Sequence, residues 1–405
     1  MPRIVITGLG LVTAIGNNTE ESWRAFLNGV DGSNELRAFD TSLYRIHRAC
    51  EVKNFDCDLP ANRRSIAIYN TVYKYVYAAA REALNDSGLL QAPGFNPERV
   101  GVALGTLASE LPVYEYHLRP EPVNKAAGFT PEVALTYPIA FTSSAIAEDF
   151  GFEGPCSMHI DACSSGNHTI AYAYDLIQSG RVDAMVVGGG EPTPQTGFTH
   201  FHNLRALAPD RCQPFDKNRQ GLMLGEGAGV LVMETYEAAS RRGAPIYAEV
   251  LSYGLSCDAY HMTAPHPEGD GARRAIAAAL ENARLSPDSI DYVSAHGTGT
   301  PLNDVTETMA LKAVLGERAY RVPTSSIKSM IGHTMGAASA IESAVCCLAL
   351  RDQIAPPTIN YETPDPGCDL DYVPNQAREL KMKIVLNNSF AFGGNNAVII
   401  FGKVR

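Results

Sequence analysis

The segment Met158–His168, with the sequence MHIDACSSGNH, decides how this chain folds and where its chemistry lies. A short apolar run leads into a thiol, then into small residues and a helical pattern that starts near Ile170. This order predicts a strand, a tight turn and a helix, with Cys163 at the helix N-terminus. The partial positive charge of a helix N-terminus lowers a cysteine pKa, and the thiolate is the nucleophile. Taken alone, a buried structural cysteine is the commoner case.

Composition restricts the class of protein. The 405 residues are 45% hydrophobic and 19% charged, which suffices for two domains or one duplicated domain. A formal net charge of -11 argues against nucleic acid as a partner. No run reaches the roughly 18 apolar residues of a membrane span, so no membrane partner is expected. The nine cysteines form no C-x-x-C pair, so we expect no metal and no disulfide framework, and free thiols favour the cytoplasm.

Apolar strand-like runs alternate with helical patterns along the whole chain. Continuous apolar strands between helices indicate a sheet covered on both faces, hence an α/β fold. The strand-like runs are Ile4–Thr7, Val100–Leu104, Ala184–Val187, Val230–Met233, Tyr292–Ser294, Ile384–Leu386 and Ala397–Phe401. Residues 80–110 and 275–304 share the order helix, turn, strand, which predicts two duplicated halves, 1–252 with the nucleophile and 253–405 with the histidines. Gly8-Leu9-Gly10 follows a strand but lacks the third glycine of a dinucleotide site.

Two histidine motifs and a glycine-rich turn favour a catalytic Cys163 over a structural one. Ser294–Thr300 (SAHGTGT) places His296 at a strand end, and Ser325–Ala338 (SSIKSMIGHTMGAA) places Lys328 and His333 before a helix of small residues. Asn388–Asn396 (NSFAFGGNN) is a turn between two strands that can offer a backbone N–H to an oxyanion. Each motif has an ordinary structural explanation, but together they form one recognisable pattern.

The chain resembles the β-ketoacyl-acyl-carrier-protein synthases of the thiolase superfamily, nearly from end to end. The resemblance lies in Val5–Gly10, Ala162–Ser165, Ala295–Thr298, Lys328–His333 and Phe392–Gly394, and also in Asp258–Thr263 and Pro356–Asn360. It is closest to the elongating synthases of type II fatty-acid systems and to type II polyketide ketosynthases. The fold that it implies is thiolase-like, with two α/β halves in a five-layered α-β-α-β-α body.

The resemblance implies an acyltransferase that performs a decarboxylative Claisen condensation. Cys163 takes an acyl group from an acyl carrier protein, and malonyl-carrier protein then loses carbon dioxide to give an enolate that attacks the acyl carbon. His296 and His333 are expected to donate N–H bonds to the enolate oxygen. The other implied roles are a fixed charge for Lys328, support for Glu342, an oxyanion N–H and gating ring for Phe392, and substrate binding for Phe201, Ala108, Thr298 and Thr300.

The same resemblance implies the partners. We expect an acyl carrier protein, with Arg63, Arg64 and Arg205 as candidate contacts, and a dimer formed either with a second copy or with a chain-length factor. The substrates are carried on phosphopantetheine, and no cofactor is expected because decarboxylation drives the reaction. Ala391 and Asn395 depart from the family's pattern and are expected to alter the motion of the gate. Asp161, Ser164-Ser165 and the segment Phe39–Arg45 favour a specialised pathway, and the small Ala108 favours a longer or wider acyl pocket.

Other classes of protein fit less well. A chain-length factor lacks the nucleophile, whereas Cys163, His296, Lys328 and His333 are all present here. A thiolase needs a second catalytic cysteine, for which there is no motif. A scaffold protein would have no use for the four groups in these contexts. The alternative that stays open is a ketosynthase subunit that is active only with a chain-length factor.

Overall fold

A computed structural model describes residues 2–63, 70–118 and 138–404 of the chain. In this part of the protein ten strands form one sheet in the order β10-β9-β13-β14-β8-β1-β7-β6-β4-β5. The strands of the first half are β1 (Ile4–Val12), β4 (Val100–Gly105), β5 (Cys156–His159), β6 (Ala184–Glu191) and β7 (Gly227–Thr235). Those of the second half are β8 (Ala248–Cys257), β9 (Tyr292–Ser294), β10 (Thr324–Ser325), β13 (Ile384–Phe390) and β14 (Asn395–Gly402). All seven strand-like runs of the sequence lie in these strands.

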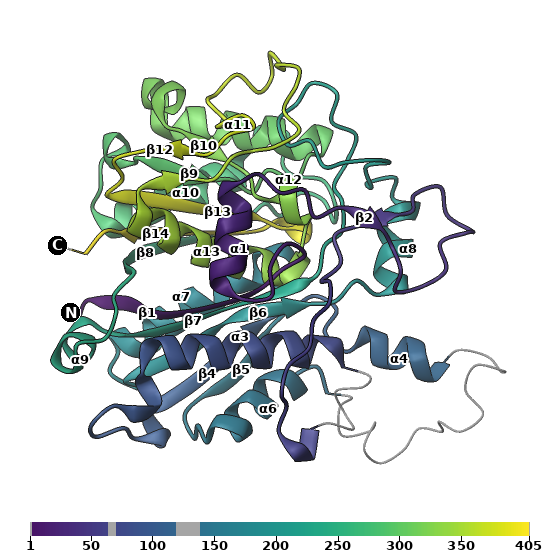
Figure 1. Cartoon of the computed structure of the whole chain (residues 1–405). Coiled ribbons are helices and arrows are strands. Elements are labelled where there is room, and N and C mark those ends of the chain that lie inside the picture. The colour runs from purple at the N-terminus through teal and green to yellow at the C-terminus, as the bar shows by residue number, and fades with distance from the viewer. Residues whose placement is uncertain (1, 64–69, 119–137, 405) are drawn as a thin grey trace.

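Helices cover both halves of the sheet and also separate them. Figure 1 shows α3 (Thr71–Ser87) and α6 (Phe141–Phe150) outside the first half, and α10 (Asp270–Ala283) and α11 (Pro301–Leu315) outside the second. Between the halves lie α7 (Ser165–Gln178) and α13 (Met335–Asp352), which contact strands of both. The predicted five-layered, thiolase-like α/β body is therefore confirmed.

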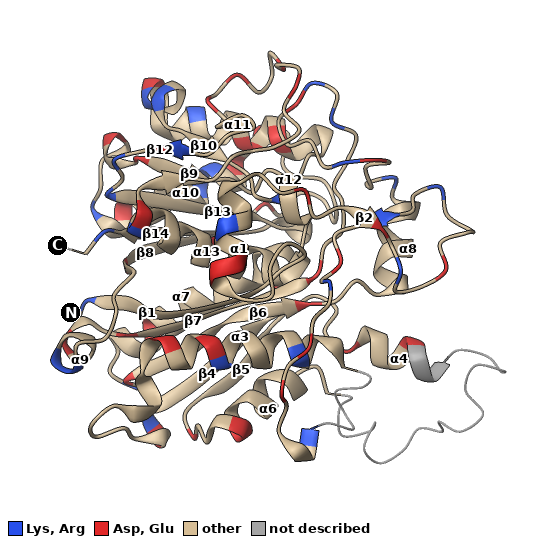
Figure 2. Ribbon diagram, viewed as in Figure 1, with Lys and Arg blue, Asp and Glu red and all other residues tan. Residues whose placement is uncertain are grey.

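The remaining elements lie around this body. They are α1 (Thr19–Leu27), α4 (Leu111–Leu118), α8 (Gln195–Asn203), α9 (Tyr236–Arg242), α12 (Lys328–Ile331) and the two-stranded pairs β2 (Asn34–Glu35) with β3 (Arg48–Ala49) and β11 (Ile354–Ala355) with β12 (Arg378–Glu379). Charged residues gather on the outer helices and loops, while the central strands carry few (Figure 2). Among the described helices, none combines the length and apolar character that crossing a bilayer requires.

Glycines let a helix pack directly on the sheet in each half. In β1 every residue is buried, and a Cβ on Gly8 or Gly10 would stand 2.0 or 1.9 Å from the carbonyl oxygens of Ala83 and Ala79 in α3. In β8 a Cβ on Gly254 would stand 2.1 Å from the carbonyl oxygen of Ala275 in α10. Because real Cβ atoms never come this close, only glycine permits these contacts. The two halves thus repeat one helix-on-strand arrangement.

The two halves join where β1 pairs with β8, through Ile4 opposite Val250 and Ile6 opposite Ala248. The predicted division after residue 252 falls inside β8, so the division into two domains stays a prediction. A second junction is the crossing of α7 and α13, where a Cβ on Gly166 would stand 2.5 Å from the backbone nitrogen of Ala340. Small residues at this crossing bring the start of each central helix to the same place in the body.

Candidate active site

Cys163 lies in a 3-10 turn, Ala162–Ser164, between β5 and the first residue of α7. The residue before it, Ala162, has a φ of +50°, which is strained for a residue with a side chain. The Cys163 carbonyl accepts hydrogen bonds from Ser389 (3.0 Å) and Ser339 (3.4 Å), which belong to the second half. The predicted strand, turn and helix are confirmed, and the turn is fixed from the opposite half of the molecule.

The thiol of Cys163 does not have the low pKa expected from its helix. Its side chain is buried, and burial raises the pKa of Cys163 to about 11. Lys328 and the backbone N–H of Phe392 act in the opposite direction but do not overcome burial. The expectation of a lowered pKa was therefore wrong, because the loss of hydration outweighs the partial charge of a helix end. At neutral pH the group is a thiol.

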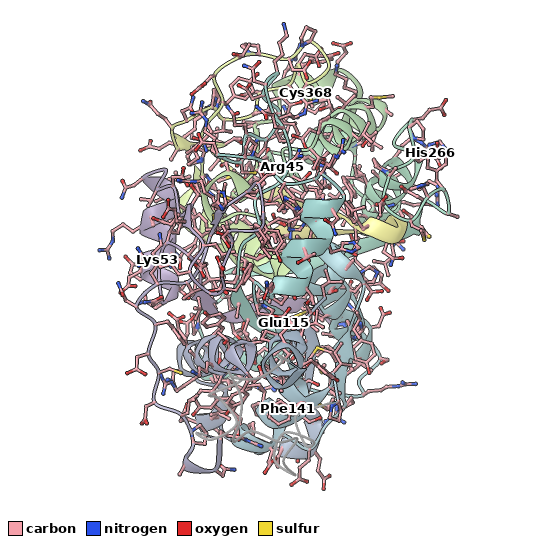
Figure 3. The ribbon with its side chains drawn as sticks, turned by 90° about the vertical axis from the view of Figure 1, so that its right-hand side faces the viewer. Arg45, Lys53, Glu115, Phe141, His266 and Cys368 are labelled. Carbon is pink, nitrogen blue, oxygen red and sulfur yellow. The ribbon has the colours of Figure 1, made fainter. Side chains whose placement is uncertain are left out.

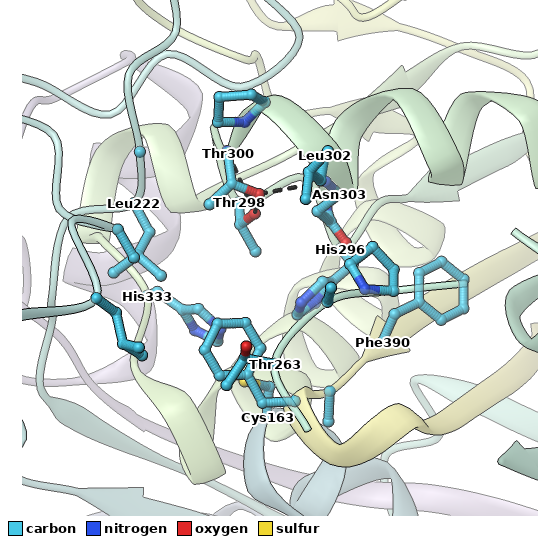
Figure 4. A pocket seen from close by; sticks show the side chains of 18 of the residues that line it. Cys163, Leu222, Thr263, His296, Thr298, Thr300, Leu302, Asn303, His333 and Phe390 are labelled. Atoms are coloured by element: carbon cyan, nitrogen blue, oxygen red, sulfur yellow. Dashed lines mark hydrogen bonds between the residues drawn. The ribbon is translucent and has the colours of Figure 1, made fainter. Parts of the chain in front are cut away.

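Two imidazoles face this thiol. The nearest nitrogen or sulfur atoms of Cys163, His296 and His333 all lie within 4.8 Å of one another, and the two imidazole rings are 5.4 Å apart (Figure 4). All three side chains are buried. Residues from three distant parts of the sequence thus meet at one point, as the motifs predict.

The tautomer of His333 follows from its hydrogen bonds. Its Nδ1 accepts a bond from the backbone N–H of Met335 (3.2 Å), so the proton lies on Nε2. That Nε2 is buried and has no partner among the described residues. Burial and the charge of Lys328 hold the pKa of His333 well below its usual value, so the ring is neutral. His333 therefore presents one free N–H donor to the cavity.

The position of His296 is fixed by hydrogen bonds from the backbone to the buried carboxyl group of Glu307. The N–H groups of His296 and Gly297 donate to the two oxygens of Glu307 (2.8 Å each), and Asn388 donates to the same carboxyl group (3.1 Å). Burial lowers the pKa of His296 well below its usual value, and Lys328 and His333 lower it further. The sequence analysis missed Glu307, although a charged residue on the buried side of α11 was a detectable signal.

Lys328 and Glu342 form a buried ion pair behind the imidazoles. Both side chains are at most 2% exposed, and burial raises the pKa of Glu342 to about 7 against the opposing charge of Lys328. The positive charge acts on Cys163, His296 and His333 together. The predicted places of Lys328 and Glu342 in the site agree with this geometry.

A cavity of about 360 Å³ connects this group to the surface. Cys163, His296, His333 and Phe392 line it. Thr298 and Thr300 line it as well, with a hydrogen bond of 3.0 Å between their hydroxyl groups (Figure 4). Thr300 also caps α11 by accepting from the N–H of Asn303. A substrate that enters this cavity can therefore contact the hydroxyl groups of Thr298 and Thr300 as well as the thiol of Cys163.

A second, much smaller cavity of about 20 Å³ lies on the other side of Phe201, which lines both. The ring of Phe201 stands 5.8 Å from that of Phe392. Ala108 and Leu107 line the small cavity, and so does Glu191, a buried carboxyl group that the sequence analysis did not single out. Phe201 therefore borders the site directly, and Ala108 lies beyond it in the small cavity.

The three predicted carrier-protein contacts differ in position. Arg205 is exposed and lines the mouth of the large cavity. Arg63 is buried, and its guanidinium donates to Asp149 (2.9 Å) and pairs with Glu148, so the structure contradicts the assumption that it is a free surface group. Arg64 lies outside the described residues.

The helices beside the site are held to one another by a carboxyl group. Glu115 of α4 accepts hydrogen bonds from the first backbone N–H groups of α8, Gln195 (3.0 Å) and Thr196. Figure 3 shows Glu115 between Phe141 in the first half and Cys368 in the second, on the side nearer to Phe141. Since α8 carries Phe201, this cap fixes the wall that separates the two cavities.

Among the described residues, the thiol and the two imidazoles are also the group that comes nearest to a metal site. Tetrahedral zinc with bonds of about 2.0 to 2.3 Å brings its ligand atoms to within roughly 3.3 to 3.8 Å of one another. The ligand atoms here all lie within 4.8 Å of one another, and the Nδ1 of His333 already accepts the N–H of Met335, which leaves Nε2 as its free ring nitrogen.

Comparison with known proteins gives one family over nearly the whole chain. Residues 1–239 match the β-ketoacyl synthase N-terminal domain and residues 247–362 match the β-ketoacyl synthase C-terminal domain. The chain is 40% identical over 414 residues to a 3-oxoacyl-[acyl-carrier-protein] synthase 2 of Coxiella burnetii, covering 99% of each.

Solved structures agree with this result. A chain of the ishigamide ketosynthase/chain length factor superimposes with a TM-score of 0.91 at 39% identity, covering 100% of both chains. A chain from a type II PKS acyl-carrier protein in complex with its ketosynthase bound to the hexaketide gives a TM-score of 0.90 at 33% identity, again over 100% of both.

Proposed function

Because this chain belongs to the β-ketoacyl synthase family, we propose that Cys163, His296, His333 and Lys328 are the groups with which it performs the family's reaction. The chain is an acyltransferase that condenses malonyl-acyl-carrier protein with an acyl thioester, in fatty-acid or polyketide chain elongation. The products are 3-oxoacyl-carrier protein and carbon dioxide. The observation that carries the assignment of roles is the convergence of one buried thiol and two neutral imidazoles within 4.8 Å.

In the first step Cys163 takes the acyl group. Its sulfur attacks the carbonyl carbon of the incoming thioester, the bond to the pantetheine sulfur breaks, and the thiol proton leaves with that sulfur. The backbone N–H groups of Cys163 and Phe392 act on the Cys163 sulfur, so they are positioned to bind the oxyanion that forms beside it. Thr298 and Thr300 would meet the pantetheine arm in the cavity above.

In the second step malonyl thioester occupies the same cavity. Loss of carbon dioxide moves an electron pair onto the thioester oxygen, and the free N–H of His333 donates to it together with His296. Neutral rings suit this task, since a donor that keeps its proton stabilises the enolate without quenching it. The enolate carbon then forms the new bond to the acyl carbon, the bond from that carbon to the Cys163 sulfur breaks, and the released thiolate takes a proton from water to return to the thiol.

Lys328 would supply the positive charge for both steps, with Glu342 holding it in place. No cofactor is assigned, because decarboxylation provides the driving force. The expected partner is an acyl carrier protein that docks over the mouth of the large cavity, where Arg205 is exposed. The nine cysteines are all free, which suits the reducing cytoplasm that we assign to the protein.

Strand β5 offers the surface for a dimer. Among the described residues it is the outermost strand of the first half, pairs only with β4, and exposes Cys156. An unpaired strand edge is a site at which another strand can extend the sheet. The added strand could come from a second copy of the chain or from a chain-length factor.

The test is intact-protein mass spectrometry of the purified chain with acyl thioesters of a fatty-acid acyl carrier protein, followed by the malonyl thioester. We expect acyl mass on the wild type but not on Cys163→Ala, and then a product two carbons longer. His296→Ala is expected to load normally and to condense about 10²- to 10³-fold more slowly. Normal condensation by His296→Ala would refute the role given to this histidine, and a wild type that never loads would refute self-sufficient activity.

A further inference from the structure

Glu191, the last residue of β6, binds backbone from both halves of the molecule. Its side chain is buried, and its two oxygens accept bonds from the N–H groups of Leu107 (2.7 Å), Ala108 (2.7 Å) and Gly336 (2.9 Å). Three N–H donors on one buried carboxyl group is a complete set of partners. The role proposed above for the catalytic groups makes no use of this residue.

The first two donors form part of the wall of the small cavity behind Phe201. Leu107, Ala108, Glu191 and Met335 all line it. At about 20 Å³ the cavity holds roughly one water molecule, so an acyl chain that extends into it must move this wall. Any such movement shifts the N–H groups of Leu107 and Ala108 relative to the Glu191 carboxyl group that binds them.

The third donor, the N–H of Gly336, belongs to the residue that follows Met335, and Met335 is hydrogen-bonded to His333. Gly336 follows Met335, whose N–H fixes the Nδ1 of His333 as an acceptor (3.2 Å) and whose φ of +40° is strained. Gly336 also packs without a gap on the same wall, because a Cβ there would stand 2.4 Å from the backbone of Thr106. Glu191, Gly336, Met335 and His333 therefore form one continuous chain of contacts.

We propose that Glu191 is a positioning residue that holds His333 in its donating orientation and ties that orientation to the wall of the acyl cavity. The proposal rests on the proposed function, since it concerns the step in which His333 acts. A residue that only stabilised the fold would affect both steps alike. Glu191 instead affects condensation more than acyl loading, because loading does not use the His333 N–H.

The variant Glu191→Gln isolates the interaction. Glutamine has nearly the same volume, but it offers one oxygen and one NH₂ group. Because both oxygens of Glu191 accept from backbone N–H groups, the NH₂ must face at least one of these donors in either orientation. Glu82→Gln is the matched control, because Glu82 also joins two segments through the N–H groups of Leu11 (3.1 Å) and Thr19 (2.9 Å), away from both cavities.

The experiment measures the two steps separately on the full chain. Hexanoyl thioester of a fatty-acid acyl carrier protein loads Cys163, the loaded protein is isolated, and the malonyl thioester is added for a single turnover. We expect Glu191→Gln to load at close to the wild-type rate and to condense about 10- to 100-fold more slowly. Glu82→Gln is expected to match the wild type in both steps.

Two results would overturn the proposal: wild-type condensation by Glu191→Gln, or an equal loss in both steps. If Glu191→Gln does not fold, Glu191→Asp decides, since it keeps the carboxyl group but is too short to reach all three N–H groups, and it should show the same split. Wild-type rates for Glu191→Asp would again overturn the proposal. A wild type that loads but never condenses would instead refute the proposed function.

Discussion

The turn at Cys163 and the turn at His333 each precede one of the two central helices, α7 and α13. Each contains a non-glycine residue in the left-handed region, Ala162 with a φ of +50° and Met335 with a φ of +40°. Each is buried, and each lies where the two halves meet. Both turns therefore contain a strained backbone position beside the residue that acts in the site, although this position precedes Cys163 and follows His333.

The surroundings of the two turns differ in charge. The His333 turn is preceded by α12, which carries Lys328, and followed by a helix buried from Met335 to Leu350 that supplies Glu342. The Cys163 turn, Ala162–Ser164, holds no charged side chain and follows the acidic Asp161, so the positive charge that acts on Cys163 comes from Lys328 across the junction. Neither half therefore contains a working site, and the reaction depends on how the halves are held together.

Removing the nucleophile is the most severe change to this pair of turns. Cys163→Ala leaves the His333 turn intact and should abolish covalent loading, with elongation reduced by at least about 10³-fold. Intact mass after exposure to acyl thioesters measures the loading. Acyl mass on the alanine variant would mean that another of the nine cysteines is the nucleophile.

His333→Ala tests the opposite turn. We expect it to load acyl groups normally but to condense about 10²- to 10³-fold more slowly, because one donor to the enolate is lost. Single-turnover product formation from a preloaded protein measures this. If loading fell as much as condensation, the two turns would not divide the reaction as proposed.

Lys328→Ala tests the charge that the two turns share. It leaves Glu342 buried and unpaired, so the free energy of unfolding should fall by about 3 to 5 kcal/mol. The double variant Lys328→Met/Glu342→Gln removes both charges and should lose much less stability. Chemical denaturation of the three proteins measures the difference, and equal losses for the single and double variants would exclude a pairing energy.

The pH dependence of the alkylation rate of Cys163 tests how strongly Lys328 acts on the Cys163 turn. With a pKa of about 11, the thiolate fraction grows with pH, so alkylation by iodoacetamide should become about tenfold faster per pH unit between pH 7 and 9. Peptide mapping of the modified protein measures Cys163 alone. A rate that levels off below pH 8 would show that Lys328 and the backbone donors outweigh burial.

The smallest expected effect concerns the junction itself. Gly166→Ala places a methyl group 2.5 Å from the Ala340 nitrogen, and separating α7 from α13 should cost about 1 to 3 kcal/mol. Gly367→Ala is the control, since its nearest neighbour would be 3.4 Å away. Thermal unfolding compares the two, and a Gly166→Ala protein as stable as the control would show that the crossing is not tightly packed.

Local sequence patterns predicted seven of the strands, the strand and turn at Cys163 and the α/β class, because apolar runs and turn residues act over short distances. They did not predict β8, which joins the two halves. The resemblance carried by the motifs predicted which distant residues meet. Neither could predict the pKa of Cys163, which depends on how completely other segments bury the thiol. The prediction that Arg63 is a surface residue was wrong for the same reason, since its partners Asp149 and Glu148 lie far along the chain. Glu191 escaped notice because its partners are backbone groups, which leave no trace in side-chain motifs.

The place of β1 in the sheet has a consequence for synthesis of the chain. Ile4–Val12 leaves the ribosome well before its two neighbours, β7 and β8, which begin only at Gly227 and Ala248. At about 5 to 20 residues per second, this apolar strand waits roughly 10 to 50 seconds for a strand with which to pair. Helix α3 arrives much sooner, and the bare faces of Gly8 and Gly10 accept it directly. The glycines that allow close packing in the folded protein thus also allow α3 to cover this apolar strand during synthesis, which reduces the risk of aggregation.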